Sequence, residues 1–593
     1  MQSAETVLSV LRERGRQGLP CDELYRQLFN PALYLMAYGN IYSNHGSMTP
    51  GVTQETADGM SMRTVDRIIG AMRHERYRFS PVRRAYAPKK NGQRRPLGIP
   101  TWSDRLVGEV MRLLLEAYYE PTFSNHSHGF RPGRGCHTAL RDVEAGWKGT
   151  TWFIEGDIAD CFGSIDHEIL LSILGEKIHD QRFLRLVRNM LKAGYVEDWE
   201  WGATFSGTPQ GGVVSPVLSN VYLNKLDEFV EKVLVPEYTR GGRRRKNPVY
   251  EKLVRERSKA RVRGDRETVL SLGKQIRHLP SYDPQDPGYR RLRYVRYADD
   301  HLLGFTGPKA EAEEIKQRLA EFLRNDLALE LSQEKTLITH ARTRAARFLG
   351  YEIIVQHADN KLTKGGRKTN GKISLRVPLQ VVRASISPYF RRGKPARDPD
   401  LVRRRDHIIV DTYGNKYRGF VQYYLLARDV WRLHRLSRVM ELSMLRTLAA
   451  KHRSSVVKMA ARYKTKVATP HGLRTCFEVV VPRRGRKPLV ARFGGIPLRR
   501  KRNTVVYDQV PEALRYHTKE LVTRIRENRC EVCGHEGMVE VHQIRRLADL
   551  HDAVSRQVGW AQIMARMRRK TLVLCSACHD RVHGSEKPAV SAV

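Results

Sequence analysis

Hydrophobic positions recur with helical spacing over long parts of the chain. Beyond residue 98, apolar residues return every three or four positions and bury one face of a predicted helix; they are Leu106, Val110, Leu114 and Ala117. The same spacing after about residue 372 predicts long amphipathic helices with a second apolar series, Tyr417, Phe420, Tyr424, Leu433, Leu436 and Met440. Residues 1 to about 80 are also expected to be mostly helical.

Short β-rich runs and a basic segment interrupt this helical pattern. Residues 88–98 (PKKNGQRRPLG) predict a strand, a turn at Gly92 and a second strand. Between residues 234 and 290 lie a basic run, a charged helix-like segment and a loop rich in Pro and Asp, which together resemble a surface insertion. The basic run consists of Arg243, Arg244, Arg245 and Lys246.

Two further β-rich runs carry acids. Residues 151–158 (TWFIEGDI) contain Asp157 near their end, and residues 292–305 (LRYVRYADDHLLGF) place Asp299 and Asp300 between two apolar arms, which predicts a hairpin with acids at its tip. Strands from distant parts of a chain can pair, so we expect the three acids to form one cluster. Such a cluster repels itself unless it binds cations, and nucleotidyl transfer needs two divalent ions about 3.5 to 4 Å apart. The alternative for the Asp-Asp pair alone is a polar turn.

The charge balance indicates the kind of partner. The 593 residues include 105 Lys and Arg against 63 Asp and Glu, a formal charge of +42. This excess points to a polyanion, because basic side chains on phosphates release condensed counterions. Hydrophobic residues make up 41% of the chain, enough for the cores of a folded multidomain protein. No apolar run is long enough to cross a membrane, so no membrane partner is expected.

Cysteine spacing predicts a metal site near the C-terminus. Two C-x-x-C pairs, Cys530/Cys533 and Cys575/Cys578, are separated by 41 residues, and four thiolates in this arrangement can close a tetrahedron around Zn²⁺. The segment between the pairs carries His542. His579 and His583 are one helical turn apart at the second pair, so they can bind one ion, and His542 would complete this ion's site. Packing within a zinc knuckle is the alternative for the last two histidines.

An ordered set of motifs identifies the family that the chain resembles. Residues 297–300 (YADD) resemble the YxDD motif of reverse transcriptases, and residues 153–162 (FIEGDIADCF) look like their first palm motif. Three further segments of these enzymes appear along the chain in the expected order: residues 127–134 (SHGFRPGR), 208–219 (TPQGGVVSPVLS) and 348–351 (FLGY). The whole chain is similar to group II intron-encoded proteins of the reverse transcriptase and maturase type that carries a C-terminal HNH-like endonuclease module.

The resemblance implies roles around the polymerase site. The three acids would hold two Mg²⁺ ions, Lys89 and Arg95 would contact the triphosphate of an incoming dNTP, and Gln210 would contact the nucleotide. Phe162 matches an aromatic gate that excludes a 2′ hydroxyl, with core packing as the alternative. Lys335 (SQEKT) matches the motif after the palm hairpin, or it is an ordinary surface charge.

The resemblance also implies a fold. We expect a multidomain α+β protein: a right-hand polymerase with fingers and palm, a helical thumb or maturase domain, and a small zinc-containing ββα-metal domain. The expected division is residues 1–80 (N-terminal helical extension and start of the fingers), 81–370 (fingers and palm, insertion about 234–290), 371–465 (thumb or maturase), 466–528 (basic DNA-binding region) and 529–593 (HNH-like domain).

Basic residues of the thumb and of the following segment are expected to bind nucleic acid. Residues 418–420 (RGF) and 423–424 (YY) are expected to begin a thumb helix, and residues 447–452 (TLAAKH) to close a later one. In the basic cluster at residues 482–502, Arg and Lys alternate with Gly and Pro, which predicts an extended, poorly self-packing strand, or else a disordered linker. The resemblance implies that this strand binds the target DNA. The expected nucleic-acid contacts, besides the run at 243–246, are Arg418, Arg483, Arg484, Arg486, Lys487, Arg499, Arg500, Lys501 and Arg502.

The HNH-like module departs from its family at one position. Where two adjacent histidines are usual, the second acting as the base, this chain has His542 followed by Gln543. Glutamine has no titratable site near neutral pH. We therefore expect a module that folds and binds zinc, with a further Mg²⁺ at its histidines, but whose DNA nicking is slow, uses a substitute base such as His551, or is absent.

The implied function is an intron-encoded reverse transcriptase and maturase. It would bind its intron RNA, assist splicing, contact target DNA and copy the inserted intron. The alternatives are an RNA-binding splicing factor without polymerase activity and a retron or defence-type reverse transcriptase. A bacterial cytoplasm is expected and an organelle is compatible; the oligomeric state stays open.

Overall fold

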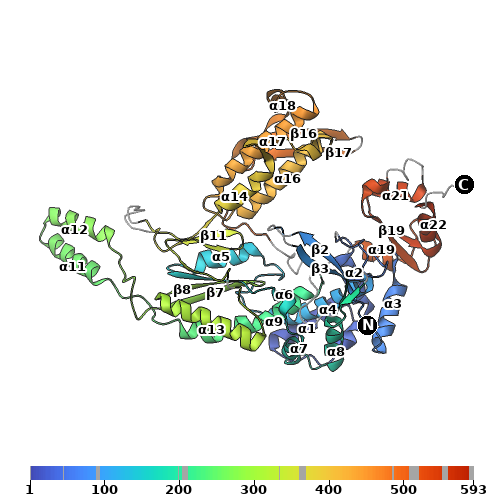
Figure 1. The fold of residues 1–593 in the computed structure, drawn as a ribbon, viewed down its shortest axis with the longest axis horizontal. Coiled ribbons are helices and arrows are strands. Elements are labelled where there is room, and N and C mark those ends of the chain that lie inside the picture. Colours follow the sequence, from blue (N-terminus) through green and yellow to red (C-terminus); the bar gives the residue numbers. More distant parts are fainter. Residues whose placement is uncertain are drawn as a thin grey trace.

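The computed structural model describes residues 2–44, 46–88, 92, 94–197, 200–202, 212–332, 334–358, 369–483, 486–506, 520–550 and 558–586. Lys89, Gln210, Arg484 and His551 lie outside the described residues. In these described parts of the chain, helices are mixed with six small sheets, and Figure 1 shows their arrangement. No helix in the described parts is both long and apolar enough to cross a membrane.

Helices dominate the N-terminal region, as predicted. They are α1 (Ala4–Gln17), α2 (Pro31–Ile41), α3 (Met62–Arg73) and α4 (Trp102–Tyr119), with a 3-10 turn at Tyr25–Phe29. All four residues of the apolar series predicted for α4 are buried. Helix α4 packs against α1 and α2, and the buried residues of these helices belong to one hydrophobic core that also includes residues of later helices.

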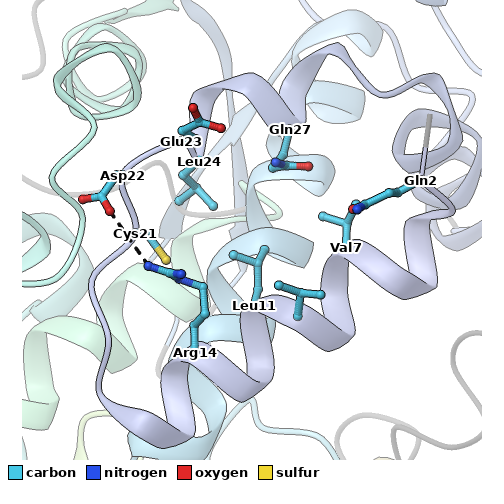
Figure 2. Close-up of a pocket in the computed structure, with 10 residues that line it drawn as sticks. Gln2, Val7, Leu11, Arg14, Cys21, Asp22, Glu23, Leu24 and Gln27 are labelled. Carbon is cyan, nitrogen blue, oxygen red and sulfur yellow. Dashed lines mark ion pairs between the residues drawn. The ribbon is translucent and has the colours of Figure 1, made fainter.

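A pocket of about 330 Å³ lies between α1 and the chain that follows it (Figure 2). Arg14 of α1 lines this pocket beside Cys21, with Nη2 3.9 Å from Asp22 Oδ2. Burial raises the pKa of the neighbouring Cys21 to about 11, so this thiol is neutral and acts as a packing residue.

The predicted hairpin near residue 92 is present, and its first strand begins earlier in the sequence than predicted. Strand β2 (Val82–Pro88) ends where the predicted run begins, and β3 (Arg94–Ile99) returns beside it. Gly92 adopts a φ of 83°, which glycine reaches without strain. The prediction of the turn is confirmed, whereas most of the predicted first strand, residues 89–91, lies outside the described residues. Strands β5 (Tyr195–Glu197) and β6 (Glu200–Gly202) complete this sheet, in the order β3-β2-β5-β6.

A second four-stranded sheet carries the predicted acids. Its strands are β4 (Trp152–Gly156), β7 (Arg291–Tyr297), β8 (Asp300–Thr306) and β9 (Ile338–His340), in the order β7-β8-β4-β9. Helices α9 (Ser215–Phe229) and α13 (Lys309–Leu327) pack below it (Figure 1). The hairpin predicted over residues 292–305 is confirmed. Other elements of this region are α5 (Cys136–Gly146), α6 (Cys161–Ser164), α7 (His167–Gly175), α8 (Gln181–Leu191), α10 (Val235–Glu237), β10 (Ala346–Phe348), β11 (Tyr351–Val355) and β12 (Ile373–Arg376).

The insertion at residues 234–290 projects from the body of the protein (Figure 1). It contains two helices, α11 (Pro248–Val262) and α12 (Arg266–His278), which pack against each other. The sequence predicted one charged helical segment. The break between the helices follows from Gly264, whose φ is 75°, and from Asp265, whose side chain accepts from the Thr268 N–H and starts α12.

Long helices follow, as predicted, and form a second core. They are α14 (Leu379–Ile386), α15 (Pro399–Val402), α16 (Asp406–Tyr424), α17 (His434–Lys451) and α18 (Val456–Tyr463), with the short strands β13 (Phe390–Arg391) and β14 (Lys394–Pro395) between them. Residues 418–424 lie in the last turns of α16, so the prediction that they begin a helix was wrong. Residues 447–451 do close α17.

The basic segment after residue 465 is a sheet. Strands β15 (Lys464–Thr469), β16 (Gly472–Arg483) and β17 (Arg486–Gly494) form an antiparallel meander. Its inward face buries Phe477, Val479, Ala491 and Phe493 in the same core as α16 and α17. The prediction of a poorly self-packing strand was therefore wrong, and the hydrophobic core continues across residue 465.

The C-terminal module packs against the N-terminal helices, as Figure 1 shows in red and blue. It comprises α19 (Glu520–Arg526), β18 (Val539–Gln543), a 3-10 turn (Leu547–Leu550), α21 (Gly559–Met567), β19 (Thr571–Cys575) and α22 (Ser576–Glu586). The two strands and α22 form a ββα arrangement. The sheet gains a third strand, because β1 (Met60–Ser61) pairs with β18.

The sheet on α16 depends on one close approach. A Cβ added at Gly414 would lie 2.1 Å from the carbonyl oxygen of Arg492 in β17. We expect Gly414→Ala to separate β17 from α16 and to lower the free energy of unfolding by about 1 to 3 kcal/mol. Chemical denaturation measures this. Gly419→Ala is the matched control in the same helix, because nothing lies within 4 Å of its Cβ; it should be neutral or stabilise by up to about 1 kcal/mol. Equal effects of the two substitutions would contradict the packing account.

Candidate functional site

Pairing of β4 with β8 brings the three acids together. Gly156 at the end of β4 lies opposite His301 of β8, and Asp157 is the next residue. Tyr297 lies opposite Asp300 in the hairpin, which leaves Ala298 and Asp299 at the tip. Acids that are 142 residues apart in the sequence thus meet at one end of one sheet.

The three acids are close enough that their charges contribute to raising the pKa values of Asp299 and Asp300. Burial, then the charges of Asp299 and Asp157, raise the pKa of Asp300 to about 7. Burial also raises the pKa of Asp299, and Asp157 contributes to that rise. Like charges in a partly buried site favour protonation unless a cation is bound, and oxygen ligands are those that hard divalent ions prefer. The donor set therefore fits divalent ions.

Two basic residues, Lys335 and Arg95, act on the acids. Lys335 Nζ lies 2.5 Å from Asp157 Oδ2, although the lysine side chain is mostly exposed. The charge of Arg95, in β3, opposes the rise in the pKa of Asp299, so this arginine faces the same site from the neighbouring sheet. In the described parts of the chain, the ligand oxygens of the three carboxylates do not all lie within 4.8 Å of one another.

Close packing fixes the register of β4 on β8. A Cβ at Gly156 would lie 2.0 Å from His301 Nε2, so only glycine leaves room for this ring. Burial lowers the pKa of His301 to about 4, which keeps the ring neutral beside the acids. On the other side of the hairpin, a Cβ at Gly129 would lie 2.4 Å from the Ala298 nitrogen. Ala298 itself has a φ of 54°, a turn conformation that these contacts hold in place.

A buried ion pair supports the hairpin tip from below. Arg296 Nη2 donates to Asp227 Oδ2 at 2.6 Å, and both side chains are essentially inaccessible to solvent. Nη1 of Arg296 donates to the Ala298 carbonyl at 2.9 Å. Tyr294 donates its hydroxyl to Asp227 Oδ1 at 2.8 Å. Sequence reasoning missed this network, although an arginine inside the apolar arm YVRY was the signal.

Phe162 lies among aromatic side chains near the acids. Its ring centroid is 6.3 Å from that of Phe130, which in turn is 6.5 Å from that of Tyr297 in the hairpin. Phe162 is half-buried in α6.

The C-terminal module contains two compact ligand clusters. The four cysteine Sγ atoms of the C-x-x-C pairs all lie within 4.8 Å of one another, and Cys533 Sγ is 3.7 Å from Cys575 Sγ. A tetrahedral Zn²⁺ with Zn–S bonds of 2.3 Å separates its sulfurs by roughly 3.8 Å, so the thiols fit a structural zinc ion. The predicted histidines form the second cluster, together with Asp58 of the N-terminal region, which sequence reasoning also missed.

Three parts of the chain match models of known protein families. Residues 87–353 match the model for reverse transcriptases (RNA-dependent DNA polymerases), residues 379–475 that for type II intron maturases, and residues 530–579 that for the AI2M/AI1M-like HNH endonucleases. The group II intron-encoded protein LtrA of Lactococcus lactis subsp. cremoris is 35% identical over 585 residues, 94% of this chain and 95% of LtrA.

The chain belongs to the group II intron-encoded proteins. Two fungal proteins are also similar along nearly the whole chain. An uncharacterized 91 kDa protein in the cob intron of Schizosaccharomyces pombe is 32% identical, over 97% of this chain and 71% of its own. A putative COX1/OXI3 intron 1 protein of Saccharomyces cerevisiae is 30% identical over 93% of this chain and 68% of its own length. Like the family, the chain combines reverse transcriptase, maturase and HNH-like domains.

The basic residues expected to bind nucleic acid in this family member divide into exposed and packed ones. Arg244 lines a cleft of about 840 Å³ between the insertion and the body, together with Arg257, Arg277 and Arg342. Arg418 is exposed on α16. Arg500, in contrast, pairs with Glu144 of α5 and donates to the Leu426 carbonyl, so it packs the segment after β17 onto the body. Arg243 stacks on Tyr282, and Arg483 donates to the Lys487 carbonyl. The other residues lie at least partly in solvent: Arg245, Lys246, Lys487, Arg499, Lys501 and Arg502. The side chain of Arg486 is not described.

The ion pair below the hairpin gives a direct prediction for this polymerase domain. Arg296→Met leaves Asp227 charged, buried and without its partner, so the free energy of unfolding should fall by about 3 to 5 kcal/mol. Primer extension should fall with it, because the hairpin tip loses its support. Arg324→Met is the control: Arg324 pairs with Glu330 on the surface, where such pairs contribute about 1 kcal/mol or less. Denaturation curves that show the same small effect for both variants would contradict the supporting role.

Proposed function

We propose that the chain is a reverse transcriptase and maturase that binds its own intron RNA, promotes splicing and copies the inserted intron into DNA at its target site. The convergence of Asp157, Asp299 and Asp300 at the end of one sheet carries this proposal. When bound there, two Mg²⁺ ions would activate the primer 3′ hydroxyl and hold the triphosphate of the dNTP.

The residues around the acids have separate roles in this proposal. The three carboxylates position the ions, and their mutual repulsion favours ion binding. Arg95 neutralises the triphosphate, and Lys89 and Gln210, outside the described residues, would contact the same nucleotide. Phe162 sits beneath the sugar and excludes a 2′ hydroxyl, so the product is DNA. Lys335 holds the Asp157 carboxylate until ions enter, which its 2.5 Å contact supports.

The proposed architecture is that of a right hand. Residues 81–370 form fingers and palm, residues 371–465 the thumb, and the C-terminal residues from 466 onward the DNA-binding region and the zinc-containing HNH-like domain. The sheet β15-β16-β17 extends the thumb, since its buried residues share the thumb core. The location we propose is the cytoplasm, in line with the bacterial relative LtrA.

Intron RNA would bind the insertion and the thumb. The basic cleft of about 840 Å³ is lined by four arginines from two sides, together with Lys148 and His278. Such a surface neutralises the closely spaced phosphates of folded RNA. Target DNA would contact the exposed basic residues of the C-terminal half.

A separation of activities tests this function. Asp299→Ala removes an ion ligand, so primer extension on an RNA template should fall by at least about 1000-fold, whereas intron binding and assisted splicing persist. Asp326→Ala, at an exposed acid of α13, is the control and should leave both activities in place. Absence of primer extension by the unmutated protein, with splicing intact, would favour the alternative of a splicing factor without polymerase activity.

A further inference from the structure

Asp58 lies against the three histidines of the C-terminal module, although 484 residues separate it from His542. Its carboxylate approaches all three rings: Oδ1 is 3.2 Å from His542 Nδ1, and Oδ2 is 2.9 Å from His583 Nε2 and 3.6 Å from His579 Nε2. His579 Nε2 and His583 Nε2 are 3.2 Å apart. A tetrahedral ion with Zn–N and Zn–O bonds near 2.0 to 2.1 Å separates its ligand atoms by roughly 3.3 Å, so this cluster has the dimensions of a zinc site.

Two further observations point to a bound cation. Nε2 of His542 is buried without a hydrogen-bond partner, and Nδ1 has only the 3.2 Å contact with Asp58, which is costly for a polar ring that is only 2% exposed. His579 uses its other nitrogen, Nδ1, to contact Glu540 Oε2 at 3.0 Å. An N–H donated from Nδ1 to a carboxylate leaves the Nε2 lone pair directed at the cluster, which is how metal-bound histidines are commonly oriented.

The donor set selects the ion and its coordination. Three imidazoles and one carboxylate suit Zn²⁺, whereas Mg²⁺ prefers six oxygen ligands. Four protein ligands complete a tetrahedron and leave no position for a water or a phosphate oxygen, as in structural rather than catalytic zinc sites. This site differs in its chemistry from a magnesium site for DNA cleavage.

The ligands come from both sides of a domain contact. Gly59 donates its N–H to the Val541 carbonyl at 2.9 Å, and the Gln543 N–H donates to Asp58 Oδ1 at 2.6 Å. Glu540 and His542 share one face of β18, so Val541 and Gln543 lie on the other. On that face Val541 joins the N-terminal core, and Gln543 Nε2 donates to the Tyr42 carbonyl at 2.8 Å.

We propose that Asp58, His542, His579 and His583 bind a second, structural Zn²⁺ that fastens the HNH-like module to the N-terminal region. Gln543 stands at the usual position of the base and instead anchors the module to that region, on the face of β18 turned away from the ion. The inference goes beyond the proposed polymerase and maturase function, and it uses none of the residues assigned to that function.

Zinc counting in the purified full-length protein tests the proposal. The unmutated chain should retain about two Zn²⁺ ions after dialysis, one at each cluster. Asp58→Asn, which keeps the side-chain volume and an acceptor for the Gln543 N–H, should retain about one. The control Asp66→Asn, at an exposed acid of α3, should retain two. One zinc ion in the unmutated chain, or two in Asp58→Asn, would overturn the proposal.

Cobalt substitution identifies which site has lost its metal. Thiolate ligands give strong sulfur-to-Co²⁺ charge transfer, whereas a site of imidazoles and a carboxylate gives weaker visible bands alone. In Asp58→Asn the charge transfer should persist, which shows that the cysteine site and its module are folded, and the weaker bands should disappear. Loss of the charge-transfer bands with retention of the others would contradict the assignment.

Amide exchange and a substitution at Gln543 test the fastening role. In Asp58→Asn the amide of Gly59 should exchange about tenfold faster, because the ion no longer links the two regions. Gln543→His should create no metal-dependent DNA nicking, because the new ring would point into the N-terminal contact. Unchanged protection at Gly59, or brisk nicking by Gln543→His, would overturn the account of this contact.

Discussion

The antiparallel pairing of β4 with β8 is the constraint on which the polymerase site depends. A sheet whose side chains alternate between faces has only one register that buries Ile154 and Leu303 and also brings Asp157 to the hairpin tip. A slip by one residue would turn every side chain of β4 to the other face. Gly156 allows this register, because any larger residue would collide with His301. The site is thus set by backbone pairing before any ion is bound.

Charge is used in two ways in this molecule. The excess of basic residues lies largely on surfaces, such as the cleft beside the insertion, where it is available to phosphates. A few charges are buried and serve the architecture instead: Arg296 with Asp227 under the hairpin, and Arg112 with Glu109 inside α4. Buried pairs of this kind fix geometry, because the loss of either partner leaves the other charge without compensation.

Local patterns predicted the elements that form from nearby residues. The hairpin at residues 292–305, helix α4 and the cysteine cluster were visible because periodicity and spacing determine them. The sheet β15-β16-β17 was missed, since the density of Arg, Gly and Pro concealed the alternation of Phe477 with Val479 and of Ala491 with Phe493. The partnership of Asp58 with the C-terminal histidines carried no signal, because β1 is a two-residue strand whose partner is decided by tertiary packing.

Anomalous diffraction from Mn²⁺ in crystals of the full chain with primer, RNA template and a non-hydrolysable dNTP tests the central claim most directly. The account predicts two manganese peaks about 3.5 to 4 Å apart, ligated between them by Asp157, Asp299 and Asp300. Absence of a manganese pair at these acids, or an Asp157 carboxylate turned away from both ions, would contradict it.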